Sequence, residues 1–309
     1  MSTNPALLQL LYARGLGPKS FRRLLLRLAG DNYPVADFVA APTSHLVRDF
    51  GLSMDTAREI REACPLALQT LEELERYGIG LLAAGAKGYP EKLARRLGDD
   101  SPPLLFVRGP VEVIEGPSVG VCGSRDASDD GMQFAADCAE ALGRRGINVV
   151  AGYAAGIDTA AHIGALASDG ATTAVLATGI LHFQLKPELA VPQAEENILV
   201  LSEFPPSLGW SASGAMRRNT TVCGLSDALL VVESGLSGGT YDAARTALRR
   251  EIPLFVARLD FPEGHGEGNP HFADRGGRWL GRGSDGAPDL DELRASLASG
   301  GPPTQTSLL

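Results

Sequence analysis

From residue 118 onward, short apolar stretches alternate with longer segments in which apolar residues recur at helical spacing. The apolar stretches predict strands at 118–122, 147–151, 172–177, 197–201, 227–232 and 252–257. The segments between them predict helices at about 130–144, 157–168, 186–195, 214–224 and 239–250. Because a helical connection places successive strands in parallel, this alternation predicts an α/β fold with a doubly wound, mostly parallel sheet.

The flanking sequence follows other patterns. Closely spaced leucines in residues 1–75 predict short helices, followed by strand candidates within 79–110. After residue 258, glycine-rich sequence predicts loops, then one acidic helix at 288–298 and a disordered tail from Gly300. We therefore predict a helical N-terminal domain at 1–78, a bridging segment at 79–116 that supplies an edge strand to the main domain, a phosphate-binding main domain at 117–285, and a C-terminal helix and tail at 286–309.

Charge limits the kind of site that the second part can hold. The net charge is −9, and it is uneven: residues 1–110 contain 14 Lys and Arg against 12 Asp and Glu, whereas residues 111–309 contain 14 against 25. Proteins that bind nucleic acid independently of its sequence usually carry a basic field. A polyanion site in the second part must therefore be a local cluster.

Composition also argues against several classes of protein. There is no run of roughly 18 apolar residues and no signal-peptide pattern, so we expect neither a membrane span nor secretion. The four cysteines are scattered and form no CxxC pair, which argues against structural zinc and predicts reduced thiols in a cytoplasm. His265 and His271 lie in a glycine-rich segment with Glu263 and Glu267, which we interpret as a solvated loop. We expect no metal and no cofactor.

The first candidate turn, Gly123-Ser124-Arg125, directly follows a predicted strand. Glycine lets the backbone approach a ligand closely, the serine is a short donor, and the arginine grips a phosphate with two parallel hydrogen bonds. The alternative is that Arg125 pairs with a surface carboxylate.

The second candidate turn contains Gly156 and Asp158, with His162 four residues further on the same helix face. Asp158 either caps the following helix or contacts a ribose or base, and the two roles are compatible. A lone histidine such as His162 is more often structural than catalytic.

The third candidate turn is Ser237-Gly238-Gly239-Thr240, which follows the strand at 228–232. Small residues before a helix form a nest of N–H donors that suits an anion, although they also suit close packing of strand and helix. Arg217-Arg218-Asn219 is the densest basic cluster in the α/β part and is a candidate phosphate contact. The alternative is that these residues are only part of the solvated surface. Since the turns fall at one edge of the sheet, we predict a phosphate-group site there.

No nucleophile with an evident base stands out, and Glu233, beside the third turn, is the one plausible catalytic carboxylate. In the N-terminal part, Gly15-Leu16-Gly17-Pro18-Lys19 resembles a helix-hairpin-helix turn, which predicts Lys19, Arg22 and Arg23 as a possible second DNA contact. The alternative is a packing unit with a solvated basic face.

Several motifs together resemble the DprA/Smf DNA-processing family. They are Gly-Tyr-Pro-Glu-Lys-Leu at 88–93, Pro-Pro-Leu-Leu-Phe-Val-Arg-Gly at 102–109, Gly-Ser-Arg at 123–125, Ala-Gly-Tyr-Ala-Ala-Gly-Ile-Asp-Thr-Ala-Ala-His at 151–162, Ser-Glu-Phe-Pro-Pro at 202–206, Arg-Asn at 218–219 and Ser-Gly-Gly-Thr at 237–240. The resemblance covers roughly residues 5–270.

The resemblance implies an extended Rossmann-like domain behind a small all-α domain of the SAM or helix-hairpin-helix kind. It also implies a non-enzymatic homodimer that binds single-stranded DNA, protects it and loads the recombinase RecA in natural transformation. DNA phosphates would be held by Gly123, Ser124, Arg125, Gly156, Asp158, Arg217, Arg218, Asn219, Ser237, Gly238, Gly239 and Thr240.

Departures from the family pattern keep a second hypothesis open. The family's Arg-Asn-Arg becomes Arg218-Asn219-Thr220, and the Tyr-Pro expected after Gly179 is missing. The sequence after residue 286 is also too short for the winged-helix domain of many members. The alternative is a small-nucleotide binder or hydrolase that resembles the cytokinin-activating phosphoribohydrolases, with Glu233 in place of their glutamate.

Overall fold

The computed structural model describes residues 4–298, which divide into two compact units. One unit comprises residues 4–108 with 178–183 and 201–209, and the other comprises 109–177, 184–200 and 210–298. The four segments expected from the sequence stay a prediction, and the tail from Gly300 lies outside the described residues. Within residues 4–298, no helix is both long and apolar enough to cross a bilayer.

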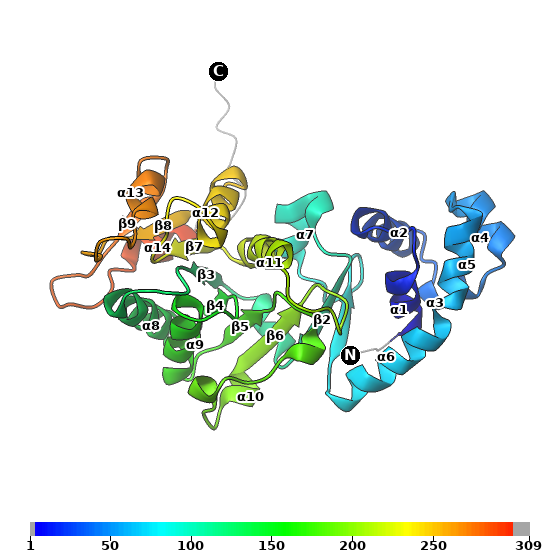
Figure 1. Cartoon of the computed structure of the whole chain (residues 1–309), viewed down its shortest axis with the longest axis horizontal. Helices are drawn as coiled ribbons and strands as arrows, with labels where there is room; N and C mark the ends of the chain where they lie inside the picture. Colours follow the sequence, from blue (N-terminus) through cyan, green and yellow to red (C-terminus); the bar gives the residue numbers. More distant parts are fainter. Residues whose placement is uncertain (1–3, 299–309) are drawn as a thin grey trace, which may run out of the picture. The chain divides into compact units, whose positions relative to one another are not determined.

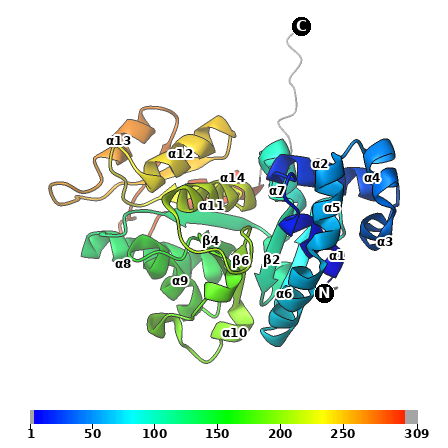
Figure 2. The same ribbon diagram turned by 45° about the vertical axis from the view of Figure 1, so that its right-hand side comes forward.

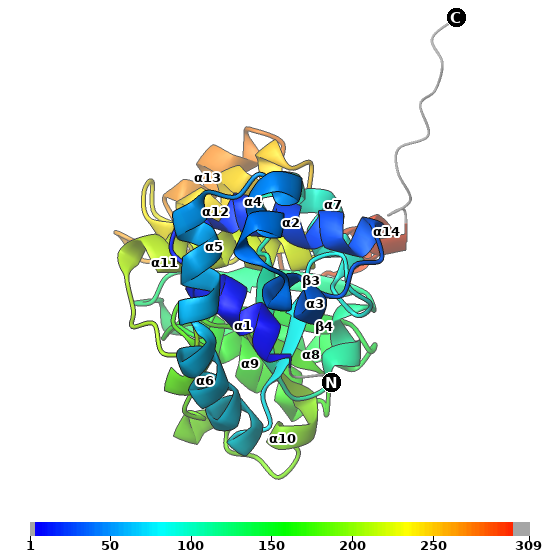
Figure 3. The same cartoon turned by 90° about the vertical axis from the view of Figure 1, so that its right-hand side faces the viewer.

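The first unit begins with short helices. They are α1 (Pro5–Tyr12), α2 (Pro18–Gly30), α3 (Val35–Ala40), α4 (Thr43–Phe50), α5 (Met54–Glu62) and α6 (Cys64–Arg76). Helix α1 lies among α3, α5 and α6 (Figure 3), and its Leu7, Leu8 and Leu10 are buried. An antiparallel pair of strands follows, β1 (Gly80–Ala83) and β2 (Leu104–Arg108), with α7 (Glu91–Leu97) between them in sequence.

The second unit contains the parallel sheet. Its strands are β3 (Ser118–Cys122), β4 (Asn148–Ala151), β5 (Thr172–Val175), β7 (Ala228–Val231), β8 (Leu254–Ala257) and β9 (Arg278–Leu280), and β6 (Ile198–Ser202) begins in this unit. They are ordered β5-β4-β3-β7-β8-β9, and each neighbouring pair is parallel. The prediction of a doubly wound, mostly parallel sheet is confirmed.

Helices cover both faces of this sheet. Helices α8 (Asp129–Gly143) and α9 (Ile157–Ala167) lie on one face, and α11 (Ala212–Leu225) and α12 (Gly239–Arg249) lie on the other (Figures 1 and 2). The core beneath α8 and α9 also receives side chains from α14 (Asp291–Ala298), including the fully buried Leu293. Burial of these apolar stripes supplies most of the stabilisation of such a layered fold.

Two sequence predictions are wrong in detail. The helix expected at 186–195 is a 3₁₀ turn at Pro187–Leu189 and a short α10 (Ala194–Asn197), because Pro192 lacks an N–H and disfavours helical geometry just before it. The loop expected after residue 258 contains α13 (Gly268–Ala273) and strand β9. Only three residues long and exposed at two of them, β9 has no recognisable apolar pattern.

Candidate functional site

The turns after β3 and β7 lie side by side at the carboxyl edge of the sheet, because these strands are neighbours. One turn leads to α8 and the other to α12, on opposite faces, and open α/β sheets bind ligands where their connections diverge in this way. A cavity of about 400 Å³ opens there. The predicted site residues that line it are Gly123, Ser124, Arg125, Asp158, Arg218, Asn219, Gly238, Gly239 and Thr240.

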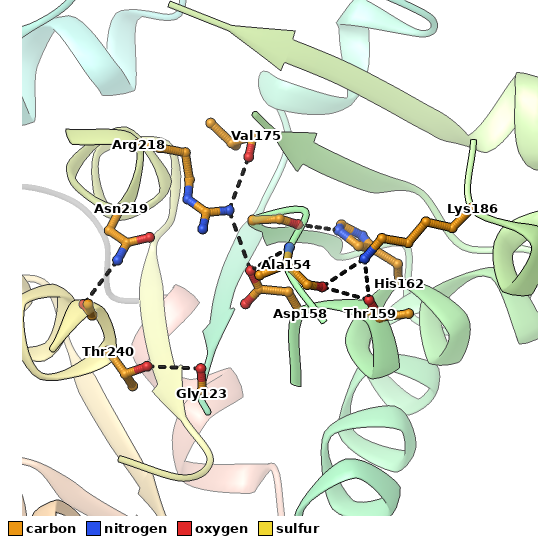
Figure 4. A network of polar contacts seen from close by, with 12 residues as sticks. Gly123, Ala154, Asp158, Thr159, His162, Val175, Lys186, Arg218, Asn219 and Thr240 are labelled. Carbon is orange, nitrogen blue, oxygen red and sulfur yellow. Dashed lines mark hydrogen bonds and ion pairs between the residues drawn. The ribbon is translucent and has the colours of Figure 1, made fainter. Parts of the chain in front are cut away.

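Arg218 is the buried cation of this cavity. It is 5% exposed, and its Nη1 donates to Val175 O at 3.2 Å and to Asp158 Oδ2 at 3.4 Å (Figure 4). Its Nε has no hydrogen-bond partner among the described residues. A buried N–H without a partner is costly, so an acceptor that reached this atom would stabilise the side chain.

Gly152 makes room for this arginine. A Cβ added at Gly152 would lie 1.3 Å from Arg218 Nη1 and 2.3 Å from Asp158 Oδ2, so no larger residue fits. The glycine after β4 is therefore required by the buried ion pair.

Asp158 does not cap α9, contrary to one of its two expected roles. It lies within the first turn of the helix and accepts from Ala154 N at 3.3 Å and from Arg218. The N-cap is Gly156, whose φ of 71° favours glycine and which has no side chain to bond the first N–H groups. Gly156 also packs against Ser124 O, 2.4 Å from an added Cβ, and so holds the first two turns together.

Asn219, within α11, and Thr240, in the first turn of α12, each bond a neighbouring segment of the cavity. Asn219 Nδ2 donates to Gly239 O at 2.9 Å, and Thr240 Oγ1 donates to Gly123 O at 2.9 Å (Figure 4). The hydroxyl hydrogen of Thr240 and one of the two amide hydrogens of Asn219 are therefore already used by the protein, which favours a positioning role for these two residues. Their contact with a phosphate stays a prediction.

The start of α12 supplies free donors. Its N-cap is Gly238, with φ of 92°, and no side chain bonds the N–H groups of the first turn. Uncapped N–H groups and the positive end of the helix dipole attract an anion. Ser237 is exposed immediately before this turn, and Arg217 is half-buried beside Arg218.

Arg125 is the exposed cation of the cavity. Within residues 4–298 its guanidinium makes no ion pair, so the carboxylate partner considered as an alternative is not seen. Its guanidinium carbon lies 5.8 Å from the centroid of the Trp210 ring. Sequence reasoning missed Trp210, although an aromatic residue within the Ser- and Gly-rich 207–214 was a usable signal.

His162 and Lys186 stabilise the second turn through hydrogen bonds to its backbone. His162 is buried, its Nε2 donates to Gly152 O at 2.6 Å, and its Nδ1 is 2.7 Å from Thr172 Oγ1. Burial lowers the pKa of His162 and keeps it neutral. Lys186 Nζ donates to Ala154 O and Thr159 Oγ1, and burial lowers its pKa as well (Figure 4). His162 is thus structural.

Glu233 lies away from the cavity. Its side chain is 1% exposed, its Oε2 accepts from Ser128 N and Oγ at 3.0 and 2.7 Å, and its Oε1 lies 2.7 Å from His265 Nδ1. Oε2 therefore fixes the start of α8, and Oε1 bonds the segment after β8. The prediction that both histidines lie in a solvated loop is also wrong. His265 bonds Glu233, and His271 Nε2 lies 3.0 Å from Tyr241 Oη. Among the described residues, no group of His, Cys, Asp and Glu could hold a metal.

Replacing His265 with glutamine is expected to lower stability more at acidic than at alkaline pH. The hydrogen bond to Glu233 raises the pKa of His265, and the charges of Asp126 and Glu267 act in the same direction. A raised folded-state pKa gives stabilisation that is complete below the unfolded-state value of about 6.5 and is lost as pH rises through the folded-state value. Urea denaturation of both proteins at about pH 5.5 and about pH 8.5 measures this, and an equal difference at both pH values would contradict it.

The basic residues of the N-terminal part are largely paired within their own unit. Lys19 Nζ lies 2.8 Å from Asp100, and Arg23 Nη2 lies 3.1 Å from Asp99. Arg22 is 8% exposed, and its Nε donates to Ser101 Oγ at 2.7 Å. These contacts support the packing interpretation, and the second DNA contact stays a prediction.

Comparisons with known proteins identify the family. The family model of DNA recombination-mediator protein A matches residues 80–287. Protein Smf of Escherichia coli is 31% identical over 264 residues, which are 82% of this chain and 69% of that protein. DNA processing protein DprA of Streptococcus pneumoniae is 30% identical over 187 residues, which are 60% of this chain and 66% of that protein.

Two solved structures share the fold. DprA of Streptococcus pneumoniae superposes with a TM-score of 0.72 at 24% identity, over 90% of this chain and 95% of that chain. DNA processing protein A of Helicobacter pylori, studied for its single-stranded DNA binding mode, superposes with a TM-score of 0.58 at 21% identity, over 72% of this chain and 95% of that chain. With a family model that covers most of its length and a curated relative at 31% identity, this chain belongs to the DNA recombination-mediator protein A family.

Proposed function

We propose that this protein binds single-stranded DNA in the cavity at the carboxyl edge of its sheet and takes part in DNA processing. The observation that carries the proposal is the buried Arg218, with an unpaired Nε, in the same cavity as the uncapped start of α12. Both features favour an anionic oxygen. The Helicobacter pylori relative, which shares this fold, is described as binding single-stranded DNA.

A local site of this kind is compatible with the acidic second part of the chain. Arg218 is held by the fold, whereas Arg125 is exposed at the rim, so one cation fixes a phosphate and the other reaches it from solvent. A flexible single strand can turn one phosphate together with its unpaired base into a recess of about 400 Å³, whereas the bases of a duplex are paired and stacked in its interior. We therefore propose single strands as the preferred form.

The finer roles rest on the family resemblance. We propose that the protein is a homodimer that protects incoming single strands and loads RecA in the cytoplasm. Light scattering tests the dimer, and a strand-exchange assay with RecA on strands covered by single-stranded-DNA-binding protein tests the loading.

The alternative of a nucleotide hydrolase required Glu233 as its catalytic carboxylate. Both oxygens of Glu233 bond other residues of the protein, which disfavours this alternative.

Replacing Arg125 with alanine is expected to weaken binding of labelled oligo-dT about tenfold or more, because one charge-assisted contact to a phosphate is lost. The slope of log affinity against log salt should become shallower by about 0.7. Fluorescence anisotropy over a salt series measures both quantities. Since Arg125 is exposed, thermal stability should not change.

The matched control for this experiment is Arg144→Ala. Arg144 is also exposed, but it follows α8 at the opposite end of that helix from the cavity. The control removes the same charge from the same protein, so it should bind oligo-dT almost as the wild type does. Equal losses in both variants would show a general effect of charge and would contradict a phosphate contact at Arg125.

A further inference from the structure

One wall of the cavity is apolar and exposed. Trp210 and Met216 are 58% and 49% exposed, and both line the cavity together with Ala212 and Ala215. All four come from one stretch, the start of α11 and the residues before it. Large apolar side chains grouped at the rim of a binding cavity mark a surface that a ligand covers.

The other walls contain cations and N–H donors, together with two acidic residues, Asp158 and Asp242, which are paired with Arg218 and Arg245. Arg218 has a buried Nε without a hydrogen-bond partner, and the first turn of α12 has N–H groups that no side chain bonds. Arg125 also lines the cavity, and its guanidinium carbon lies 5.8 Å from the centre of the Trp210 ring. The cavity is therefore suited to a ligand that has an anionic group at one end and a flat apolar group at the other.

We propose that Trp210, with Met216 beside it, is the platform on which one base of the bound strand stacks. This inference rests on the proposed function and assigns the position of one nucleotide: its phosphate lies toward Arg218 and α12, and its base lies on the indole. Stacking on an aromatic ring tolerates every base, because each base has a π face. Arg125 interacts with the ring through its charge and, from the same position, reaches the phosphate at the rim.

This arrangement explains why so large an aromatic surface is left exposed near Arg125. The guanidinium orients the indole in the free protein, so less side-chain freedom is lost when a base arrives. Met216 is unbranched and polarizable, and it adapts to purines and pyrimidines alike. The site should consequently show little preference among bases but a clear requirement for a base.

An abasic strand has phosphates but no bases, so it separates the contribution of the base to binding from that of the phosphate. The test compares labelled oligo-dT with an abasic strand of equal length, for the wild type, Trp210→Ala and Trp210→Phe, by fluorescence anisotropy at one salt concentration. Wild type should bind oligo-dT about tenfold more tightly than the abasic strand, from the usual contribution of one stacked base. Trp210→Ala should lose most of this ratio, and Trp210→Phe should keep most of it.

The two tryptophans of the chain allow a direct readout. In a Trp279→Phe background, Trp210 is the remaining indole, and oligo-dT should quench its fluorescence whereas the abasic strand should not. If the wild type binds oligo-dT but Trp210→Ala keeps the same ratio between the two strands, the stacking inference is overturned while DNA binding stands. If the wild type binds neither strand, the proposed function itself fails.

Discussion

Replacing Arg218 with alanine is expected to abolish measurable binding of oligo-dT and to destabilise the protein by about 3 kcal/mol. The loss of stability follows from burial: Asp158 is 6% exposed, and removing its ion-pair partner leaves a buried carboxylate with only the more distant Lys186 as a countercharge. The loss of binding follows from the removal of the only buried guanidinium among the described residues that line the cavity. Anisotropy and urea denaturation measure the two effects separately.

A double variant distinguishes a ligand contact from a structural role. Replacing a buried ion pair with neutral groups of similar size is often close to neutral for stability. Asp158→Asn with Arg218→Met should therefore recover most of the lost stability but none of the binding. If this double variant bound oligo-dT as the wild type does, Arg218 would be a purely structural residue, and the proposed phosphate contact would be refuted.

Replacing Gly164 with alanine is expected to destabilise the second unit by about 3 kcal/mol, at the upper end of the usual effect of overpacking. An added Cβ would lie 2.0 Å from Ala136 O and 2.7 Å from Ala136 Cα, which are backbone atoms of α8. Backbone cannot move aside like the end of a side chain, so α9 would have to separate from α8. That movement would loosen the core around Phe134 and displace Asp158 in the first turn of α9.

Gly30→Ala is the control for this substitution. Gly30 also lies in a helix, α2, but an added Cβ there would meet no atom within 4 Å. Alanine favours helix by about 1 kcal/mol over glycine, so this control should be neutral or slightly stabilising in urea denaturation. If Gly164→Ala proved as stable as wild type, the close approach of α8 and α9 would not be a structural requirement.

The family resemblance and the fold class were both accessible from the sequence, because each depends on local pattern. Apolar strands separated by helical segments have few alternatives to a parallel sheet, and all six predicted strands occur in the structure. The glycine turns were recognisable for the same reason. Gly156 and Gly238 adopt positive φ, a conformation that side chains disfavour, so their positions mark turns even without coordinates.

The elements that were missed lack such a local pattern. Strand β9 is three residues long and pairs with β8 only because the returning chain brings it to the edge of the sheet. The helix expected at 186–195 has apolar residues at suitable spacing, but Pro192 interrupts it. Trp210 lies in a segment that composition marks as flexible, and its place beside Arg125 depends on where α11 begins.

Roles within the site depended on tertiary structure. Sequence alone placed Arg125 and Arg218 in one set of phosphate contacts. In the structure Arg125 is exposed, whereas Arg218 is buried and its Nε has no hydrogen-bond partner. Sequence also placed Glu233 beside the third turn, whereas the fold directs its carboxylate to Ser128 and His265. A sequence motif predicts which residues lie near the end of a strand. Which of their polar atoms remain available to a ligand is decided by contacts between segments far apart in the chain, and only the tertiary structure contains those contacts.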